Sequence, residues 1–335
     1  MQAYVVQQGA TSLEGLRRVE RPDPRPGAGQ VLVRMRAAAL NYRDQLIVAG
    51  TYFGGSVARD TIPMSDGAGE VVEIGHGVTR FKVGDRLTAT FFRGWAEGPP
   101  RGPLVALGNP ADGILAEYAV LDQNDAAELP KSLSFEEGAT LACAGVTAWN
   151  AIVRTCGVKP GQAVLIMGTG GVSLFALQFA RAVGARIILI SSSDEKIERG
   201  RALGADVGIN YRRAPEWEQE VLRATAGRGV DHIVEVGGPG TLARSMRAIG
   251  YGGHIALIGL LAGFEGDTGP HPLMVKGAAL HGIFVGNRSM LEELSAAIDV
   301  NGLKPVIDRV FDFGAAHEAF RHQRGGAFGK VVIRI

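Results

Sequence analysis

The stretch VLIMGTGGVSLFALQFARAVGA, residues 164–185, joins an apolar β-type run to an apolar helical run through a glycine-rich turn. The run at 163–167 predicts a buried strand, and Gly168, Gly170 and Gly171 follow it directly. Glycines at such a turn let the backbone approach a pyrophosphate, which then lies against free N–H groups at the start of the helix. The stretch therefore predicts a dinucleotide site.

The turn departs from the usual dinucleotide motif at one position. Ser173 stands where a third glycine is usual, and we expect helix and strand to pack slightly further apart there. A lone glycine motif is a weak signal, but here a strand precedes it, a helix follows, and a second apolar strand comes at 185–191. We predict a dinucleotide site that includes Val172, and the alternative is a purely structural turn.

Residues 125–288 alternate apolar strand-type runs with helical segments. Strand-type runs occur at AVLIMG, ARIILIS, HIVEVGG, HIALIGLL and LHGIFVG, and near-continuous apolar strands are typical of a parallel sheet covered on both faces. The pattern predicts an α/β domain with the doubly wound parallel sheet of the Rossmann fold.

The remaining sequence is rich in β-type runs separated by glycine and proline. Such runs occur at AYVVQ, QVLVRMRAAAL, GEVVEIG, GDRLTATFF and EYAVL, and β-type sequence returns at PVIDRVFDF and GKVVIRI. We predict that residues 1–124 and 289–335 form one mostly antiparallel β domain. The α/β domain would then be an insertion, with a cleft between the two.

The composition points to a small or neutral partner. The 335 residues carry 35 basic and 34 acidic side chains, net +1, without a basic run that would indicate a nucleic-acid or membrane surface. The two cysteines, Cys143 and Cys156, form no disulfide framework or C-x-x-C pair, and no segment reads as a signal peptide or membrane span. We expect a cytoplasmic protein.

Three serines and a lysine follow the second strand of the α/β domain, in LISSSDEK at 189–196. An acid there would accept hydrogen bonds from the adenosine ribose and repel a 2'-phosphate, whereas Ser191, Ser192, Ser193 and Lys196 offer hydroxyls and a cation. The stretch favours NADPH, with NADH possible. Its other interpretation is a capping box of Ser192 and Glu195 at the next helix, with Lys196 solvated.

Several longer stretches, taken together, resemble one protein family. VKPGQAVLIMGTGGVSLFALQFARAVGA, LSFEEGATLACAGVTAWNAI, SDGAGEVVEIGHGVTRFKVGDR and FGKVVIRI are similar to the medium-chain dehydrogenase/reductase superfamily, over nearly the whole chain. The segment Asn41–Asp44 resembles its zinc-lacking quinone oxidoreductase-like branch, which is also catalogued as NAD(P)-dependent alcohol dehydrogenase-like. The resemblance implies a GroES-like catalytic domain beside the Rossmann domain.

The resemblance extends poorly to the family's catalytic zinc. Asn41 stands at the position of the first ligand, Ser65–Gly67 replaces the stretch with the ligand histidine, and only Cys143 matches the third. A catalytic zinc needs three protein ligands and an open position. The four cysteines of the structural zinc lobe are also missing, so we predict no zinc, and interpret Cys143 as a small buried hydrophobe.

Without a metal, a conjugated enone or a quinone is an easier hydride acceptor than a simple aldehyde, because its negative charge spreads to an enolate or hydroquinone oxygen. By resemblance to quinone and enoyl reductases, Asn41 and Tyr52 are the catalytic candidates, and Tyr52 would donate a hydrogen bond or a proton. Tyr52 could instead simply cover the core. Arg43 is left out of the catalytic set, and Phe91, Phe92 and Trp95 line either a substrate mouth or the core.

The resemblance also implies cofactor contacts outside the glycine turn. Thr147 would lie near the nicotinamide, Tyr211 near the 2'-phosphate, and Lys330 at the pyrophosphate, whereas backbone at Gly259, Leu260 and Val285 would hold the carboxamide. The histidines, among them His76, His232, His254 and His281, match no catalytic position of the family, and we expect them to be structural or solvated.

Three functions remain open from the sequence. The leading one is a metal-independent NADPH-dependent reductase of an activated C=C bond or a quinone, acting on a largely uncharged substrate. The others are an NAD(P)-dependent alcohol dehydrogenase and an NADPH-binding protein without turnover. The strand at LHGIFVG could pair with its twin across a two-fold axis, which predicts a homodimer.

Overall fold

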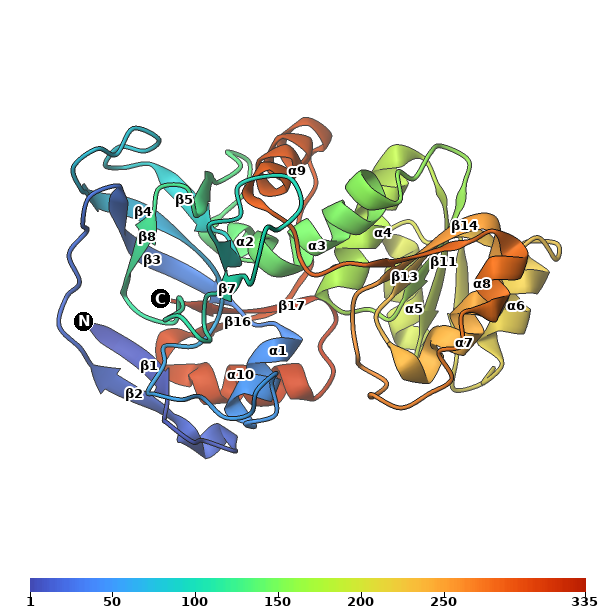
Figure 1. The fold of residues 1–335 in the computed structure, drawn as a ribbon, viewed down its shortest axis with the longest axis horizontal. Coiled ribbons are helices and arrows are strands. Elements are labelled where there is room, and N and C mark those ends of the chain that lie inside the picture. Colours follow the sequence, from blue (N-terminus) through green and yellow to red (C-terminus); the bar gives the residue numbers. More distant parts are fainter. The chain divides into compact units, whose positions relative to one another are not determined.

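The computed structural model describes all residues, 1–335, and they divide into two compact units (Figure 1). Unit 1 comprises Met1–Val146 and Gly286–Ile335, and unit 2 comprises Thr147–Val285. The sequence placed the boundaries after residues 124 and 288. The segment after residue 124 lies in unit 1 because its strand β9 (Ala126–Glu128) pairs with β5 (Arg86–Ala89) of that unit.

A six-stranded sheet in the order β12-β11-β10-β13-β14-β15 forms the centre of unit 2, and all its neighbouring strands are parallel. The strands are β10 (Ala163–Met167), β11 (Arg186–Ser191), β12 (Val207–Asn210), β13 (Val230–Glu235), β14 (Ile249–Leu257) and β15 (Ala279–Gly282). The sequence predicted this doubly wound sheet but missed β12. Parallel pairing brings all six carboxyl ends to one edge, and the strand order reverses between β10 and β13.

Helices cover both faces of this sheet. They are α4 (Gly171–Val183), α5 (Asp194–Ala202), α6 (Trp217–Ala224), α7 (Pro239–Ala248) and α8 (His271–Lys276). Trp217 and Val221 of α6 and Leu242 and Met246 of α7 pack in one buried cluster with alternate residues of the strands, such as Ile188. The opposite-facing strand residues are buried as well, which explains why these strands read as continuous apolar runs.

Unit 1 is built on a seven-stranded sheet in the order β16-β17-β3-β4-β5-β9, with β8 also pairing with β3. Its pairs are antiparallel except β16 with β17, so the prediction of a mostly antiparallel domain is confirmed. The further strands are β3 (Gln30–Ala39), β4 (Asp66–Ile74), β8 (Tyr118–Asp122), β16 (Ile307–Asp312) and β17 (Lys330–Arg334). Two small sheets pair β1 (Gln2–Val6) with β2 (Leu16–Glu20) and β6 (Phe92–Arg93) with β7 (Val105–Ala106).

Unit 1 also contains helices α1 (Tyr42–Val48), α2 (Phe135–Gly138), α9 (Arg288–Asn301) and α10 (Ala316–Arg324), with short 3₁₀ turns at Leu13–Gly15 and Phe313–Ala315. The division between the units falls inside α3 (Val146–Trp149), which π-helical turns at Leu141–Gly145 and Asn150–Thr155 flank. The N-terminus of α1 and the start of β17 position the polar cluster of unit 1 described below, because β17 pairs with β3 just before α1 begins.

Candidate active site

The glycine turn after β10 has the geometry that a pyrophosphate site requires. Gly168 has a φ of +75°, a conformation that favours glycine, and α4 begins at Gly171 with Val172 in its first turn. A Cβ added at Gly170 would meet no atom within 4 Å, so open space lies over the turn. The first N–H groups of α4 and this space fit an anionic diphosphate.

Ser173 in place of the third glycine is accommodated by a hydrogen bond. Its hydroxyl is buried and donates to Met167 O on β10 over 2.7 Å. The serine thus joins helix and strand directly.

The serine-rich turn after β11 lies beside the end of β12, because Ser191 pairs in register with Asn210. Tyr211 N donates to Ser191 O over 3.1 Å, and the Tyr211 side chain is 40% exposed. The structure therefore brings the candidate 2'-phosphate residues Ser191, Ser192, Ser193, Lys196 and Tyr211 to one corner of the carboxyl edge.

The cap of α5 differs from the sequence prediction by one residue. Ser193, not Ser192, is the N-cap, and its hydroxyl accepts a hydrogen bond from Lys196 N. The acid of this turn, Asp194, accepts a 2.8 Å hydrogen bond from Asn210 Nδ2 and forms an ion pair with Arg213. Sequence reasoning missed this pair, because Arg213 comes only after β12.

The carboxamide candidates Gly259, Leu260 and Val285 follow β14 and β15 at the same carboxyl edge. Val285 has a φ of +65°, which is unusual for a β-branched residue. Asn150 Nδ2 donates to Val285 O over 2.7 Å and so holds this turn. Thr147, the nicotinamide candidate, is buried at the start of unit 2.

A buried carboxylate that the sequence analysis overlooked orders the turn after β13. Glu235 is fully buried, and its Oε1 accepts hydrogen bonds from Gly237 N (2.7 Å), Gly238 N (3.1 Å) and Thr241 Oγ1 (2.7 Å). Ser245 Oγ donates to its other oxygen. Because β10 and β13 flank the point where the strand order reverses, this turn borders the crevice where ligands of doubly wound sheets bind.

In unit 1, a buried ammonium lies among the residues that resemble zinc-ligand positions. Lys330 is 3% exposed, and its Nζ donates to Leu40 O and to Asn41 Oδ1, both over 2.7 Å. The same ammonium lies 3.7 Å from Asp66 Oδ2. The predicted contact of Lys330 with a pyrophosphate stays a prediction, and the ammonium would have to leave these oxygens to make it.

The carboxylate of Asp66 is fully buried and bound on both oxygens. Ser65 Oγ donates to its Oδ1 over 2.7 Å, and Cys143 N donates to its Oδ2 over 3.1 Å. Burial, together with the Asp66 charge, raises the pKa of the Cys143 thiol far above its usual value. Cys143 is therefore a neutral thiol here.

Two polar atoms of this cluster have no partner. Asn41 N donates to Asp44 Oδ2 over 2.7 Å at the N-terminus of α1, but the amide nitrogen Nδ2 of Asn41 and the Oδ1 of Asp44 are buried without a hydrogen bond. An unsatisfied buried polar group costs about 1–3 kcal/mol. Burial raises the pKa of Asp44 to about 6, although the nearby Arg43 lowers it. The N-x-x-D spacing, typical of a capping box, could have indicated Asp44 from the sequence.

Arg43 and Tyr52 belong to the same buried neighbourhood. The Arg43 guanidinium donates to Leu107 O (2.7 Å) and Asn109 O (3.1 Å), and lies over the rings of Tyr52 and Phe91. Burial raises the pKa of the half-buried Tyr52. Arg43 therefore packs against the catalytic candidate Tyr52, which is a structural role that the sequence did not reveal.

The remaining aromatic candidates belong mainly to the core of unit 1. Phe91 and Phe92 are buried and pack edge to face at 4.6 Å between ring centroids, and Trp95 is half-buried. The buried pair favours the core interpretation for Phe91 and Phe92.

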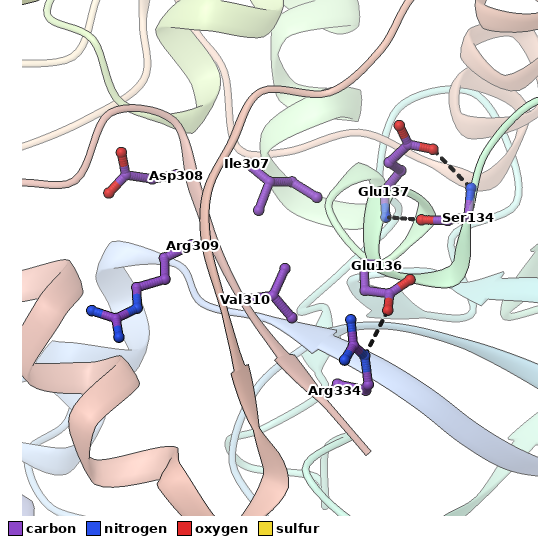
Figure 2. A pocket seen from close by; sticks show the side chains of 8 residues that line it. All are labelled: Ser134, Glu136, Glu137, Ile307, Asp308, Arg309, Val310 and Arg334. Carbon is purple, nitrogen blue, oxygen red and sulfur yellow. Dashed lines mark hydrogen bonds and ion pairs between the residues drawn. The ribbon is translucent and has the colours of Figure 1, made fainter.

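An open depression of about 480 Å³ on unit 1 contains none of the predicted site residues. Figure 2 shows its lining by α2 and the strands β16 and β17. Its acidic groups already have partners: Glu136 pairs with Arg334 at 2.9 Å, Asp308 with His322 at 2.7 Å, and Glu137 accepts a 2.8 Å hydrogen bond from the backbone N of Ser134. It is not a candidate for the chemistry.

Comparison with known proteins identifies the family. Residues 27–131 match the family described as Alcohol dehydrogenase GroES-like domain, and residues 171–300 match Zinc-binding dehydrogenase. A zinc-type alcohol dehydrogenase-like protein of Schizosaccharomyces pombe is 42% identical over 344 residues, which cover 99% of both chains. The chain belongs to the medium-chain dehydrogenase/reductase superfamily. Its GroES-like and Rossmann folds are thereby confirmed, and it is an oxidoreductase of that superfamily.

Other members of the superfamily carry different names. A crystal structure described as an NAD-dependent alcohol dehydrogenase is 33% identical, covers 100% of both chains and has a TM-score of 0.91. The quinone oxidoreductase of Sus scrofa is 28% identical over 92% of this chain and 90% of its own. Members of the superfamily use NAD(P)H, and the glycine turn fits that cofactor.

The zinc implied by the family description has no obvious ligand set in this chain. The matched segment 171–300 includes neither Asn41 nor Asp66 nor Cys143. No group of three or more His, Cys, Asp or Glu side chains lies together in a way that could hold a metal ion.

None of the helices is both long and apolar enough to cross a membrane.

Proposed function

We propose that the protein is a metal-independent, NADPH-dependent reductase that delivers hydride to an activated C=C bond or a quinone. The observation that carries the proposal is the buried ammonium of Lys330, which lies between Asn41 and Asp66. Asn41 and Asp66 are the residues that stand where zinc ligands would be expected by resemblance. A cation of the chain itself already neutralises this cluster.

The donor set does not fit a catalytic zinc. The Asn41 Oδ1 and both Asp66 oxygens already accept hydrogen bonds or pair with the Lys330 ammonium, so Cys143 is the only thiol available near them. A Zn²⁺ ion would also lie against the Lys330 ammonium, and the two charges would repel each other.

A site without a Lewis acid favours a substrate whose charge delocalises on reduction. The nicotinamide, when bound, supplies the hydride. The chain would supply hydrogen-bond donors to the oxygen that becomes an enolate or hydroquinone, and the unpartnered Asn41 Nδ2 and the Tyr52 hydroxyl are the candidates. Because burial raises the pKa of Tyr52, its hydroxyl stays protonated at neutral pH and is available as a hydrogen-bond donor.

The preference for NADPH rests on the corner formed by the ends of β11 and β12. Ser191, Ser192 and Ser193 bring hydroxyls there, Lys196 brings a cation, and the Asp194 carboxylate is already paired with Arg213. A paired acid repels a 2'-phosphate less than a free one would. Dissociation constants for NADPH and NADH, measured side by side at one ionic strength, test this preference.

Isotope transfer tests the reaction itself. The chelator-treated protein is incubated with cyclohexenone and NADPH deuterated at C4, using the 4R and 4S forms in separate reactions. Deuterium at the β-carbon of the product supports the proposal. Asn41→Ala should lower kcat by about 10²-fold, whereas Asn301→Ala, which removes an exposed asparagine at the end of α9, should leave it unchanged.

Alcohol dehydrogenase activity is the second candidate, favoured by the names of the 42% and 33% identical relatives. It predicts deuterium at the carbinol carbon, and a stoichiometric zinc whose removal abolishes activity. Tight NADPH binding without oxidation by enones, quinones or aldehydes would indicate instead a binding protein without turnover.

We also propose a homodimer formed through β15, the edge strand of the unit 2 sheet. Leu280 on this strand is 39% exposed, and the neighbouring α8 exposes Met274 and Val275. Light scattering during size exclusion should give a dimer mass for the native protein and a monomer mass for Leu280→Arg. Val300→Arg, at an exposed apolar residue of α9, is the matched control and should remain dimeric.

A further inference from the structure

Lys330 and Asn41 form a buried contact between β17 and the start of α1. The ammonium donates to Asn41 Oδ1 and to Leu40 O, both over 2.7 Å, and Asp66 Oδ2 lies 3.7 Å away. These three oxygens surround a side chain that is 3% exposed.

This contact fixes which way the Asn41 amide points. An ammonium carries donors only, so the amide atom that faces it must be the carbonyl oxygen. The Nδ2 group then points away from Lys330, and it is buried without a partner. The backbone N–H of Asp44 faces the Asn41 side chain as well, so the start of α1 and the ammonium favour the same amide orientation.

From this arrangement we infer that Lys330 is a positioning residue, which holds the Asn41 amide so that Nδ2 donates a hydrogen bond to the oxygen of the substrate that becomes negative. The inference rests on the proposed function and names the group that would stabilise its oxyanion. The ammonium also withdraws electron density through the amide, which strengthens the N–H donor. The positive charge of Lys330, separated from the oxyanion by the Asn41 amide, would also stabilise the oxyanion directly.

Neighbouring groups hold Lys330 in this role. Asp66 lies next to the ammonium, and Ser65 Oγ and Cys143 N hold that carboxylate in turn. Because the ammonium already faces three oxygens of the chain, it acts through Asn41 and not as a proton donor to the substrate.

The test uses 4-nitrophenolate as a stand-in for the oxyanion, bound to the full chain saturated with NADP⁺ and followed by its absorbance. We expect Asn41→Ala and Lys330→Met each to weaken binding about tenfold. In the double variant, Lys330→Met should cause no further loss, because its effect passes through Asn41. The inference would be overturned if the losses of phenolate affinity from Asn41→Ala and Lys330→Met multiplied in the double variant. It would also be overturned if Asn41→Ala bound the phenolate as tightly as the native protein.

A second variant separates positioning from folding. Lys330→Gln keeps an N–H donor toward Asn41 Oδ1 without the charge, and should recover part of the binding lost in Lys330→Met. If Lys330→Met does not fold, the same cycle is measured with Lys330→Gln. The NADPH dissociation constant should change less than twofold in both variants, whereas a large increase with unchanged phenolate binding would assign Lys330 to the pyrophosphate instead.

The phenolate measurement does not depend on turnover. A native protein that binds 4-nitrophenolate through Asn41 but reduces no enone or quinone would disprove the proposed function and leave the amide contact standing. Conversely, if the native protein reduces enones and Lys330→Met reduces them at the same rate, the proposed function would stand and the positioning role of Lys330 would be disproved.

Discussion

Asn150 donates a 2.7 Å hydrogen bond to the carbonyl of Val285, which adopts a φ of +65°. A β-branched residue in this region is strained by about 1–3 kcal/mol and keeps the conformation only where its surroundings impose it. Asn150 is itself held, because its Oδ1 accepts a 2.8 Å hydrogen bond from Thr155. A side chain in the helical segment thus fixes the backbone after β15, where the carboxamide candidate lies.

Replacing Asn150 should release this turn. We expect Asn150→Ala to lower the free energy of unfolding of unit 2 by about 1–2 kcal/mol and to weaken NADPH binding several-fold. Urea unfolding and nucleotide titration measure the two effects. Asn301→Ala removes a similar 2.8 Å amide hydrogen bond at an exposed site of α9 and should change neither by much. Equal effects of the two variants would contradict a special role for Asn150.

The ion pair between Asp194 and Arg213 should influence cofactor preference. Arg213→Ala leaves the Asp194 charge uncompensated beside the serine turn, so the affinity for NADPH relative to NADH should fall about two- to fivefold. Adding Asp194→Asn should restore the ratio. Arg223→Ala, which breaks an exposed pair with Glu220 on α6, is the control and should not alter it. An unchanged ratio in Arg213→Ala would show that the acid does not face the nucleotide.

Acid should destabilise unit 2 through His232. Its ring stacks on His254 at 5.5 Å between centroids, its Nε2 hydrogen-bonds Gln162 Oε1 over 2.8 Å, and burial lowers its pKa from 6.5 to about 4. A histidine with a lowered native pKa binds its proton more readily in the unfolded chain. Its contribution to stability is therefore complete above about pH 6.5 and is lost as the pH falls toward 4.

Urea unfolding at pH 7.5, 6 and 5 checks this. The native protein should lose about 1–2 kcal/mol over that range from this group. His232→Gln should show a shallower dependence, whereas a variant at His76, which lies in an exposed turn, should follow the native curve. If His232→Gln shows the same slope as the native protein, another group is responsible.

The carboxylate of Glu235 should be essential for its turn. Glu235→Gln replaces one buried acceptor oxygen with a donor that faces either N–H groups or the Ser245 hydroxyl, so unit 2 should lose about 2–3 kcal/mol of stability. Glu220→Gln on the exposed face of α6 is the control, with little expected change. Thermal unfolding measures the difference, and a native-like melting temperature for Glu235→Gln would contradict it.

The sequence predicted the elements whose signals are local. The glycine turn at 168–171 and the apolar strands of the parallel sheet were recognisable because neighbouring residues carry the whole pattern. Strand β12 was missed because Val207–Asn210 is short and includes a glycine and an asparagine. The cap of α5 was misplaced by one residue because consecutive serines offer equivalent caps.

The polar cluster of unit 1 could not be derived in the same way. Lys330 and Asn41 are 289 residues apart, and only the pairing of β17 with β3 brings them together. The resemblance suggested the importance of Asn41 from its position, but the contact of its amide with that distant lysine could not be read from the local sequence. The Asp194–Arg213 pair likewise depends on the register of β11 with β12.

The pairing of β17 with β3 also sets an order for folding during synthesis. Unit 2 is contiguous, so its sheet can form as soon as residues 147–285 have left the ribosome. The sheet of unit 1 cannot be completed as early. On one edge of β3, β8 pairs with residues 30–34, but residues 37–39 stay unpaired until β17, residues 330–334, has been synthesised. The nascent chain therefore carries an exposed β edge through most of its translation, and chaperone binding to the first 146 residues would protect it from aggregation.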